Sequence, residues 1–230
     1  MNLHSPSLTR VAATLAFASL AGGASAATDY AEGWNAGSTA GWTANTIDST
    51  VAQNGAGGNP DGYLASHGPA PGTFPIGART EVAAATGDFS GFLWTASFDA
   101  RQFTGIPTDL ALRFRFQDPG FNGWRYDFAD LPVANGWKNY SVAFDPSWSN
   151  AQAVGNGWRT DLPGGAGSVS WQQNMKNVFS TEVRLDTGTN SVLGIDNFKL
   201  VSRPVPEPST YALFAAGLIG IGALARRRKA

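Results

Sequence analysis

The sequence predicts an all-β protein whose main part is one antiparallel β-sandwich, and three observations lead to this. Glycine is frequent (28 of 230 residues), and charged residues make up only 14% of the chain. Several stretches alternate apolar and polar side chains with a period of two, the spacing of a half-buried strand. Clusters of Gly, Pro, Asn and Asp separate these stretches, as in antiparallel sandwiches.

The clearest strand pattern covers residues 110–117. Its apolar side chains alternate with Arg113 and Arg115. The same period occurs in 92–99, 124–128, 139–144 and 179–185, and a last strand is expected near 193–201. The predicted core includes Leu112, Phe114, Phe116, Val142, Phe144, Val183 and Leu185. On the polar face we expect cross-strand ion pairs, exposed to solvent, among Arg113, Arg115, Arg125 and Asp127, in preference to the alternative that these side chains form a ligand site.

One short helix and two long loops are expected within the sandwich. Ser170 and Gln173 have the spacing of a capping box, which predicts a helix over 171–177. Segments 49–80 and 145–170 are rich in Gly, Pro and Asn and show no clear period. They are expected to be loops, and loops of this length often carry function.

The end of the chain combines an apolar run with a basic cluster. The fifteen residues from Tyr211 to Ala225 carry no charge, and they precede Arg226, Arg227, Arg228 and Lys229. A helix of that length is about 22 Å long, short of the full bilayer core, but flanking residues and snorkelling cations extend it. We expect a membrane helix over about 210–225 with its cations on the cytoplasmic side. A buried core helix is the other interpretation, although such a helix would not usually end in four cations.

The beginning of the chain has the pattern of a secretory signal peptide. Arg10 is its only charged residue before Asp29, and an apolar stretch covers 11–23. Ala24-Ser25-Ala26 fits the small-x-small motif of signal peptidase, which predicts cleavage between Ala26 and Ala27. The predicted organisation is a signal peptide at 1–26, an exported domain at 27–204 and a C-terminal tail at 205–230.

The tail resembles the PEP-CTERM sorting signal. In that family a Pro-Glu-Pro motif, a short apolar helix and an Arg-rich cluster follow one another, and Val205, Pro206, Glu207 and Pro208 match the motif. The resemblance implies export across the inner membrane of a Gram-negative bacterium that makes extracellular polysaccharide. It also implies a transient membrane anchor, cleavage of the tail by an exosortase, and release to the cell surface or the medium.

The exported domain resembles laminin B (domain IV)-like modules and, through them, galactose-binding-like jelly-roll carbohydrate modules. The matching segments are AEGWNAGSTAGW (31–42), GGNPDGYLASHG (57–68), ATGDFSGFLWTASFDA (85–100), NGWKNYSVAFD (135–145) and LGIDNFKL (193–200). The resemblance implies glycan binding or a structural role in a biofilm matrix. It also implies a structural calcium ion, for which Glu32 and Asp196 are candidate ligands and Asp61 a third. A turn-capping Asp196 and a solvated Glu32 remain the alternative.

The predicted glycan site lies in the loop over 145–162. Trp148 and Trp158 are expected to be exposed there, because the surrounding Gly and Asn residues do not favour a strand. Indole faces stack on sugar rings, and Asn150, Asn156 and Asp161 would bond the hydroxyl groups. A structural role for both indoles stays open.

The composition excludes several classes of function. The chain has no cysteine, which excludes thiol catalysis and Cys–Zn sites. His67 is the only histidine of the exported domain, and no nucleophile-elbow motif is present, so no catalytic residue is assigned. Acidic residues outnumber basic ones in 27–204, which argues against a nucleic-acid partner. A non-catalytic glycan-binding or matrix module is predicted, with an exported polysaccharide lyase or glycoside hydrolase as the alternative.

Overall fold

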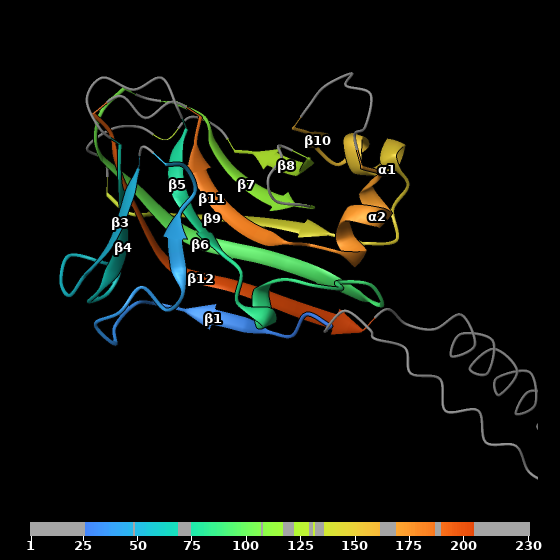
Figure 1. Cartoon of the computed structure of the whole chain (residues 1–230), viewed down its shortest axis with the longest axis horizontal. Coiled ribbons are helices and arrows are strands. Elements are labelled where there is room, and N and C mark those ends of the chain that lie inside the picture. The colour runs from blue at the N-terminus through green and yellow to red at the C-terminus, as the bar shows by residue number, and fades with distance from the viewer. Residues whose placement is uncertain are drawn as a thin grey trace, which may run out of the picture.

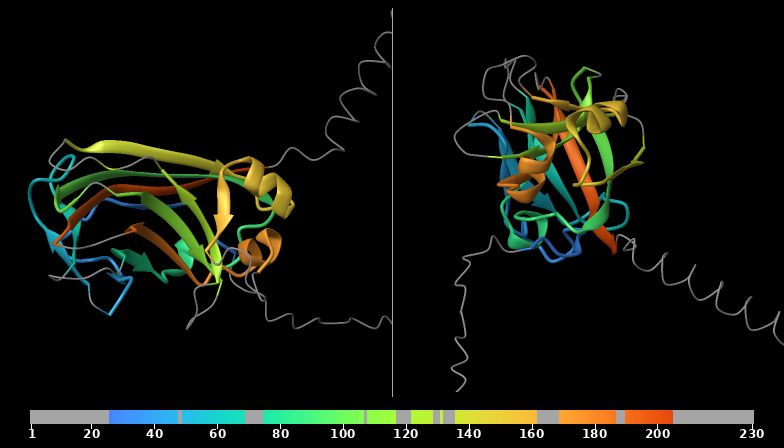
Figure 2. Two further views of the ribbon diagram at one scale, coloured as in Figure 1. Left: turned by 90° about the horizontal axis from the view of Figure 1, so that it is seen from above. Right: turned by 90° about the vertical axis from the view of Figure 1, so that its right-hand side faces the viewer.

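Two antiparallel six-stranded sheets face each other in the computed structural model (Figures 1 and 2). The structure describes residues 26–47, 49–68, 75–106, 108–116, 122–128, 131, 136–161, 169–186 and 190–204. The apolar stretch of the predicted signal peptide, expected to be helical, and the predicted membrane helix over 210–225 lie outside these residues. Within them, no helix has the length and apolar character needed to cross a membrane. The predicted all-β antiparallel sandwich is confirmed.

Sheet 1 has the order β3-β4-β12-β6-β9, and β1 also pairs with β12. Its long central strands are β6 and β12, which run side by side over most of their lengths. The strand bounds are β1 (Tyr30–Glu32), β3 (Thr50–Asn54), β4 (Tyr63–His67), β6 (Phe92–Thr104), β9 (Lys138–Phe144) and β12 (Val192–Pro204).

Sheet 2 has the order β10-β8-β7-β11-β5-β2. Its strands are β2 (Trp42–Ala44), β5 (Ile76–Thr80), β7 (Leu110–Arg115), β8 (Gly123–Asp127), β10 (Trp158–Thr160) and β11 (Ser180–Leu185). A 3₁₀ turn (Ala83–Ala85) precedes β6, and the helices α1 (Asn150–Gly155) and α2 (Trp171–Lys176) lie at one end of the sandwich (Figure 1).

The space between the sheets is filled largely by aromatic rings. Phe114 of sheet 2 packs on Phe144 of sheet 1 with ring centroids 5.0 Å apart, and the Trp158 ring lies stacked on Phe114 at 5.5 Å. All predicted core residues are buried except Phe116, which is half-buried and packs against the core. The facing predicted for β7 is therefore confirmed for Leu112 and Phe114.

The short helix predicted from Ser170 is confirmed as α2. The Ser170 hydroxyl accepts a hydrogen bond from the Gln173 backbone N–H at 3.2 Å, which caps the first turn.

The prediction that 49–80 and 145–170 are loops is wrong for much of their length. The first segment contains β3, β4 and β5, and the second contains α1 and β10. Strand β4 escapes a period-two search because Leu64, Ala65 and Ser66 are all buried, as in a central strand covered on both faces. Helix α1 opens with a complete capping box between Ser149 and Gln152.

Candidate functional site

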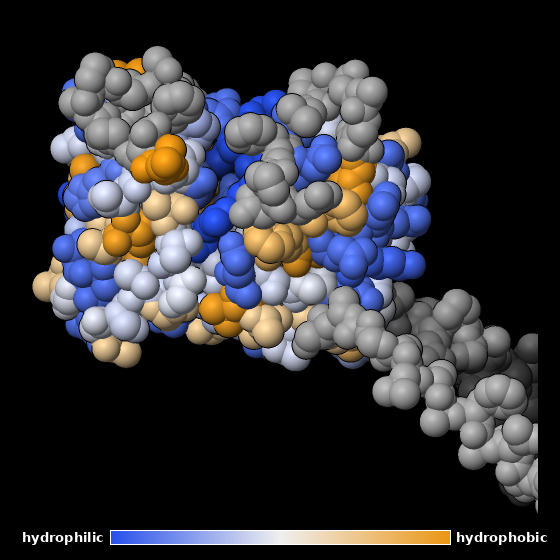
Figure 3. Space-filling view, in the orientation of Figure 1, coloured by the Kyte–Doolittle hydropathy of each residue, from blue (hydrophilic) through white to orange (hydrophobic). Residues whose placement is uncertain are grey.

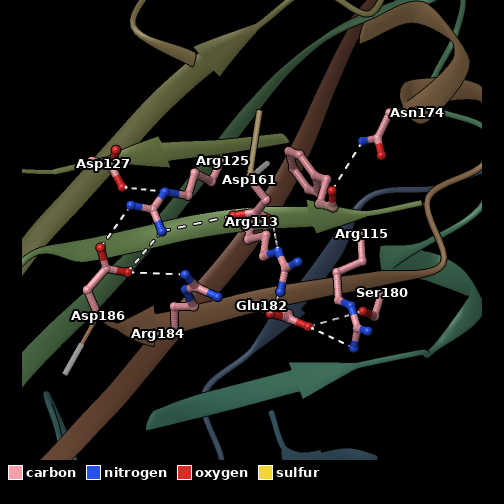
Figure 4. Close-up of polar contacts among 11 residues, drawn as sticks. Arg113, Arg115, Arg125, Asp127, Asp161, Asn174, Ser180, Glu182, Arg184 and Asp186 are labelled. Carbon is pink, nitrogen blue, oxygen red and sulfur yellow. Dashed lines mark hydrogen bonds and ion pairs between the residues drawn. The ribbon is translucent and has the colours of Figure 1, made fainter. Parts of the chain in front are cut away.

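The outer face of sheet 2 carries a chain of alternating basic and acidic side chains (Figure 4). Because Leu112, Phe114 and Val183 point into the core, their strand neighbours point outward. Arg113 of β7 lies opposite Arg125 of β8 on one side and Glu182 of β11 on the other. We call the following side chains the ionic network: Arg113, Arg115, Arg125, Asp127, Arg159, Asp161, Glu182, Arg184 and Asp186.

Arg125 is the centre of the network. Its Nη1 and Nη2 donate to the two carboxylate oxygens of Asp186 at 3.0 and 2.8 Å, a bidentate pair. Its Nε lies 3.0 Å from Asp127, and its Nη1 lies 3.9 Å from Asp161. One guanidinium therefore compensates three carboxylates that come from different parts of the chain.

The other arginines extend the network in both directions. Arg113 contacts Asp161 through Nε and Glu182 through Nη1, the latter at 3.2 Å. Glu182 also forms an ion pair with Arg115, whose Nη1 lies 3.4 Å from Glu182 Oε1. Arg184 donates to Asp186 at 3.2 Å, and Arg159 pairs with Asp127. The result is a continuous line of contacts across β10, β8, β7 and β11.

The cross-strand ion pairs predicted for this face are present, but the prediction of a solvent-exposed face is wrong. Arg113 is 3% exposed and Glu182 is 1% exposed. Burial is also the main reason why the pKa of Asp127 is raised, although the nearby Arg125 opposes this rise. In Figure 3, strongly hydrophilic residues gather in the middle of the face that β5, β7 and β11 form. A buried set of paired charges on an outer sheet face is unusual enough to need an explanation.

The predicted exposure of Trp158 is wrong. Trp158 lies in β10 opposite Tyr126 and is 1% exposed, because the pairing of β10 with β8 turns the indole into the core. Trp148 is half-buried and stacks on Trp171 with ring centroids 5.9 Å apart. The structure therefore does not bring the two indoles together at an exposed loop tip.

The polar residues of the predicted glycan site do not form one cluster, because each takes part in a different contact. Asn150 Oδ1 accepts a hydrogen bond from the Trp171 backbone N–H at 2.8 Å, and Asn156 Nδ2 donates to the Gln152 carbonyl at the end of α1. Asp161 alone belongs to the ionic network. Glu182, Arg184 and Asp186 were not selected from the sequence, although the alternation of Glu182 and Arg184 with Val183 and Leu185 was visible there.

The predicted calcium ligands lie on sheet 1. Asp196 is buried, its two oxygens accept backbone N–H groups of Asn59 and Asn197, and it lies opposite Asp99. Glu32 accepts the Trp34 N–H at 2.7 Å. Among the described residues, no three His, Cys, Asp or Glu side chains lie together closely enough to hold a metal ion. Within the described part of the chain, Glu32 and Asp196 are therefore not part of the cluster of three such side chains that the predicted calcium site would need.

His67 is not part of the ionic network. It is exposed at the end of β4 and pairs in sheet 1 with Thr50 and Val192, whereas the arginines lie on the outer face of sheet 2. A polysaccharide lyase that used a tyrosine, an arginine and His67 would need these residues in one site, and His67 lies apart from the arginines of the ionic network.

Comparison with known protein families identifies the PEP-CTERM protein-sorting motif at residues 204–229, which confirms the prediction for the tail. The motif implies export and exosortase-mediated sorting to the cell surface. A search of curated proteins finds no significant match.

Solved structures show the same fold. The CBM22-1 xylan-binding domain from Paenibacillus barcinonensis Xyn10C matches with 13% identity and a TM-score of 0.50, over 77% of this chain and 95% of that one. The tandem CBM22-1-CBM22-2 domain of the same protein matches with 12% identity and a TM-score of 0.50, over 78% of this chain and 46% of that one. The family 11 carbohydrate-binding module of Clostridium thermocellum Lic26A-Cel5E matches with 16% identity and a TM-score of 0.49, over 79% and 98%. The described domain is thus an all-β sandwich like CBM22.

Proposed function

We propose that this chain is an exported protein, transiently anchored by its tail and processed by an exosortase, whose sandwich is a non-catalytic glycan-binding module of the exopolysaccharide matrix. Its boundaries would be those of the sequence: a signal peptide at 1–26, a jelly-roll domain at 27–204 and a sorting tail at 205–230. The tail motif supports the first half, and the fold shared with a domain described as xylan-binding supports the second.

The exposed edge of the ionic network is the proposed glycan contact, formed by Arg159, Asp127 and Asp186, whose side chains are 47%, 21% and 25% exposed. Its continuity with the buried ion pairs across four strands is the observation that carries the proposal. Sugar hydroxyl groups donate and accept hydrogen bonds, and ion-paired guanidinium and carboxylate groups offer both functions in fixed positions. Side chains held by their ion pairs lose little further freedom when a ligand binds, which favours affinity.

The same network argues for binding rather than hydrolysis. A glycoside hydrolase needs one carboxyl group that is protonated near neutral pH. Each network carboxylate is engaged by at least one arginine, so the network offers no carboxyl group that stands apart from a cation as a proton donor would. Asp127, whose pKa is raised, still contacts both Arg125 and Arg159.

Affinity electrophoresis of the processed chain in gels with the host exopolysaccharide, xylan or mixed-linkage glucan tests this proposal. Asp186→Asn and Arg159→Ala change the more exposed members of the network, and we expect each to weaken retention about tenfold, or ~1.4 kcal/mol. Lys199→Ala on sheet 1 is the matched control and should leave retention unchanged. Absence of retention on all three polymers would refute the binding function, and a fall in polymer length would favour the enzyme.

A further inference from the structure

Exposed apolar side chains gather at the end of sheet 1 where the chain continues into the sorting tail. Phe92 and Leu93 begin β6, Val201 lies near the end of β12, and their exposed fractions are 39%, 37% and 41%. In the β6–β12 register Leu93 lies opposite Arg203, and Thr95 lies opposite Val201. Leu93 and Val201 are therefore diagonal neighbours on the outer face.

Two cations complete this surface. Lys199 and Arg203 are exposed and lie two residues on either side of Val201, so all three point to the same face of β12. We call Leu93, Lys199, Val201 and Arg203 the tail-side patch, since Phe92 points to the other face of β6 beside Trp94. Single exposed apolar residues are ordinary, but two apolar neighbours between two cations, beside the start of the sorting tail, indicate a contact surface.

The sequence places this patch close to the membrane before processing. Strand pairing continues to Pro204, which lies opposite Phe92, and the sorting motif begins at the same residue. Only residues 205–210 separate Pro204 from the uncharged run that begins at Tyr211. Six extended residues span at most about 20 Å, so an inserted tail keeps Pro204, at the edge of the patch, within that distance of the bilayer.

We propose that the tail-side patch lies against the lipid bilayer while the chain is still anchored. This rests on the anchoring step of the proposed function and is independent of glycan binding. Leu93 and Val201 would enter the boundary between headgroups and acyl chains, and Lys199 and Arg203 would meet lipid phosphates. Tethering raises the effective concentration of the surface, so a small patch suffices for contact.

The absence of cysteine from the chain allows a direct test with single labels. The full chain is inserted into liposomes of phosphatidylcholine with phosphatidylglycerol, carrying an environment-sensitive fluorophore on Val201→Cys. Ile106→Cys is the matched control, because Ile106 is exposed and follows the opposite end of β6. We expect a blue-shifted emission and strong quenching by spin-labelled lipid at position 201, and neither at position 106.

Two variants and two readouts separate the explanations. Leu93→Asp should reduce lipid quenching at position 201 while the far-ultraviolet circular dichroism spectrum stays unchanged. Equal quenching at positions 201 and 106 would overturn the proposal, as would failure of the chain to float with the liposomes, which would also remove the anchor. Quenching at position 201 that appears only when membranes contain the processing enzyme would overturn it in favour of a protein contact. Retention of the same chains on polysaccharide reports the glycan proposal separately.

Discussion

The outer faces of the two sheets both bury carboxylates, but they compensate the charge differently. On sheet 2, arginines contact Asp127, Asp161, Glu182 and Asp186 directly. On sheet 1, Asp99 and Asp196 lie opposite each other, and their contacts among the described residues are amide N–H groups of Asn59, Asn139 and Asn197. The first face pairs each charge with an opposite charge, whereas the second offers only dipoles.

This difference decides how each face responds to change. A buried ion pair adds little net stability over an apolar pair, yet removal of one partner leaves a buried charge alone and is costly. Amide dipoles compensate a carboxylate less fully. Burial is the main reason why the pKa of Asp196 is raised, and repulsion from Asp99 and Asp61 adds to it while the two backbone hydrogen bonds oppose it. Burial raises the pKa of Asp127 on sheet 2 as well, but there Arg125 opposes the rise. The faces should therefore differ in sensitivity to mutation and to pH.

The largest effect is expected from Arg125→Ala. This change removes one arginine contact from each of Asp127, Asp161 and Asp186, and each keeps a second arginine, so we expect the free energy of unfolding to fall by up to about 3–5 kcal/mol. Urea unfolding of the processed chain measures it. Arg203→Ala, an exposed arginine of β12, is the control and should change stability by less than about 0.5 kcal/mol. Equal effects of the two variants would mean that the ionic network is already hydrated.

The second effect concerns pH and sheet 1. Because the pKa of Asp196 in the folded chain lies above its ordinary value of 3.8, its ionised form destabilises the fold at neutral pH. As pH falls through the folded pKa towards 3.8, protonation of Asp196 removes its buried charge. The free energy of unfolding of the wild type should therefore rise relative to that of Asp196→Asn. The relative gain is about 1.4 kcal/mol for each unit of pKa difference, and urea unfolding from pH 7 to pH 4 measures it.

Asp29 gives the opposite sign in the same series. Hydrogen bonds from Ser202 lower its pKa, so its contribution is present above the unfolded pKa and is lost as pH falls through the folded pKa. Asp29→Asn should therefore remove this loss of stability as pH falls.

The amide contacts of Asp196 predict the same melting temperature in calcium and in EGTA. A calcium-dependent rise that Asp196→Asn abolishes would instead place an ion at this carboxylate.

Within sheet 2, the sequence predicted some features correctly and missed others. In β7 one face is buried among apolar rings, so the alternation of Leu112 and Phe114 with Arg113 gave the facing correctly. The same alternation predicted the ion pairs but not their burial. The burial depends on Asp161 and Asp186, which follow β10 and β11, and only the pairing of the strands brings these residues beside Arg125. Trp158 was misplaced because a three-residue strand between glycine-rich neighbours has too few positions to show a period.

The smallest effect is expected from Arg101→Ala on the outer face of sheet 1. The Arg101 guanidinium lies 4.5 Å from the Phe103 ring centroid, and Phe103 stacks on Tyr63 at 5.3 Å. Arg101 is half-buried, and it forms no ion pair with the described carboxylates, so its removal strands no charge. The loss of a partly exposed cation–π contact should cost about 0.5–1 kcal/mol. Arg101→Lys keeps a cation and should recover part of it. If Arg101→Ala lowered the free energy of unfolding by as much as Arg125→Ala, both faces would depend on arginines. The proposed difference between the two sheets, arginines on one and amide dipoles on the other, would then be wrong.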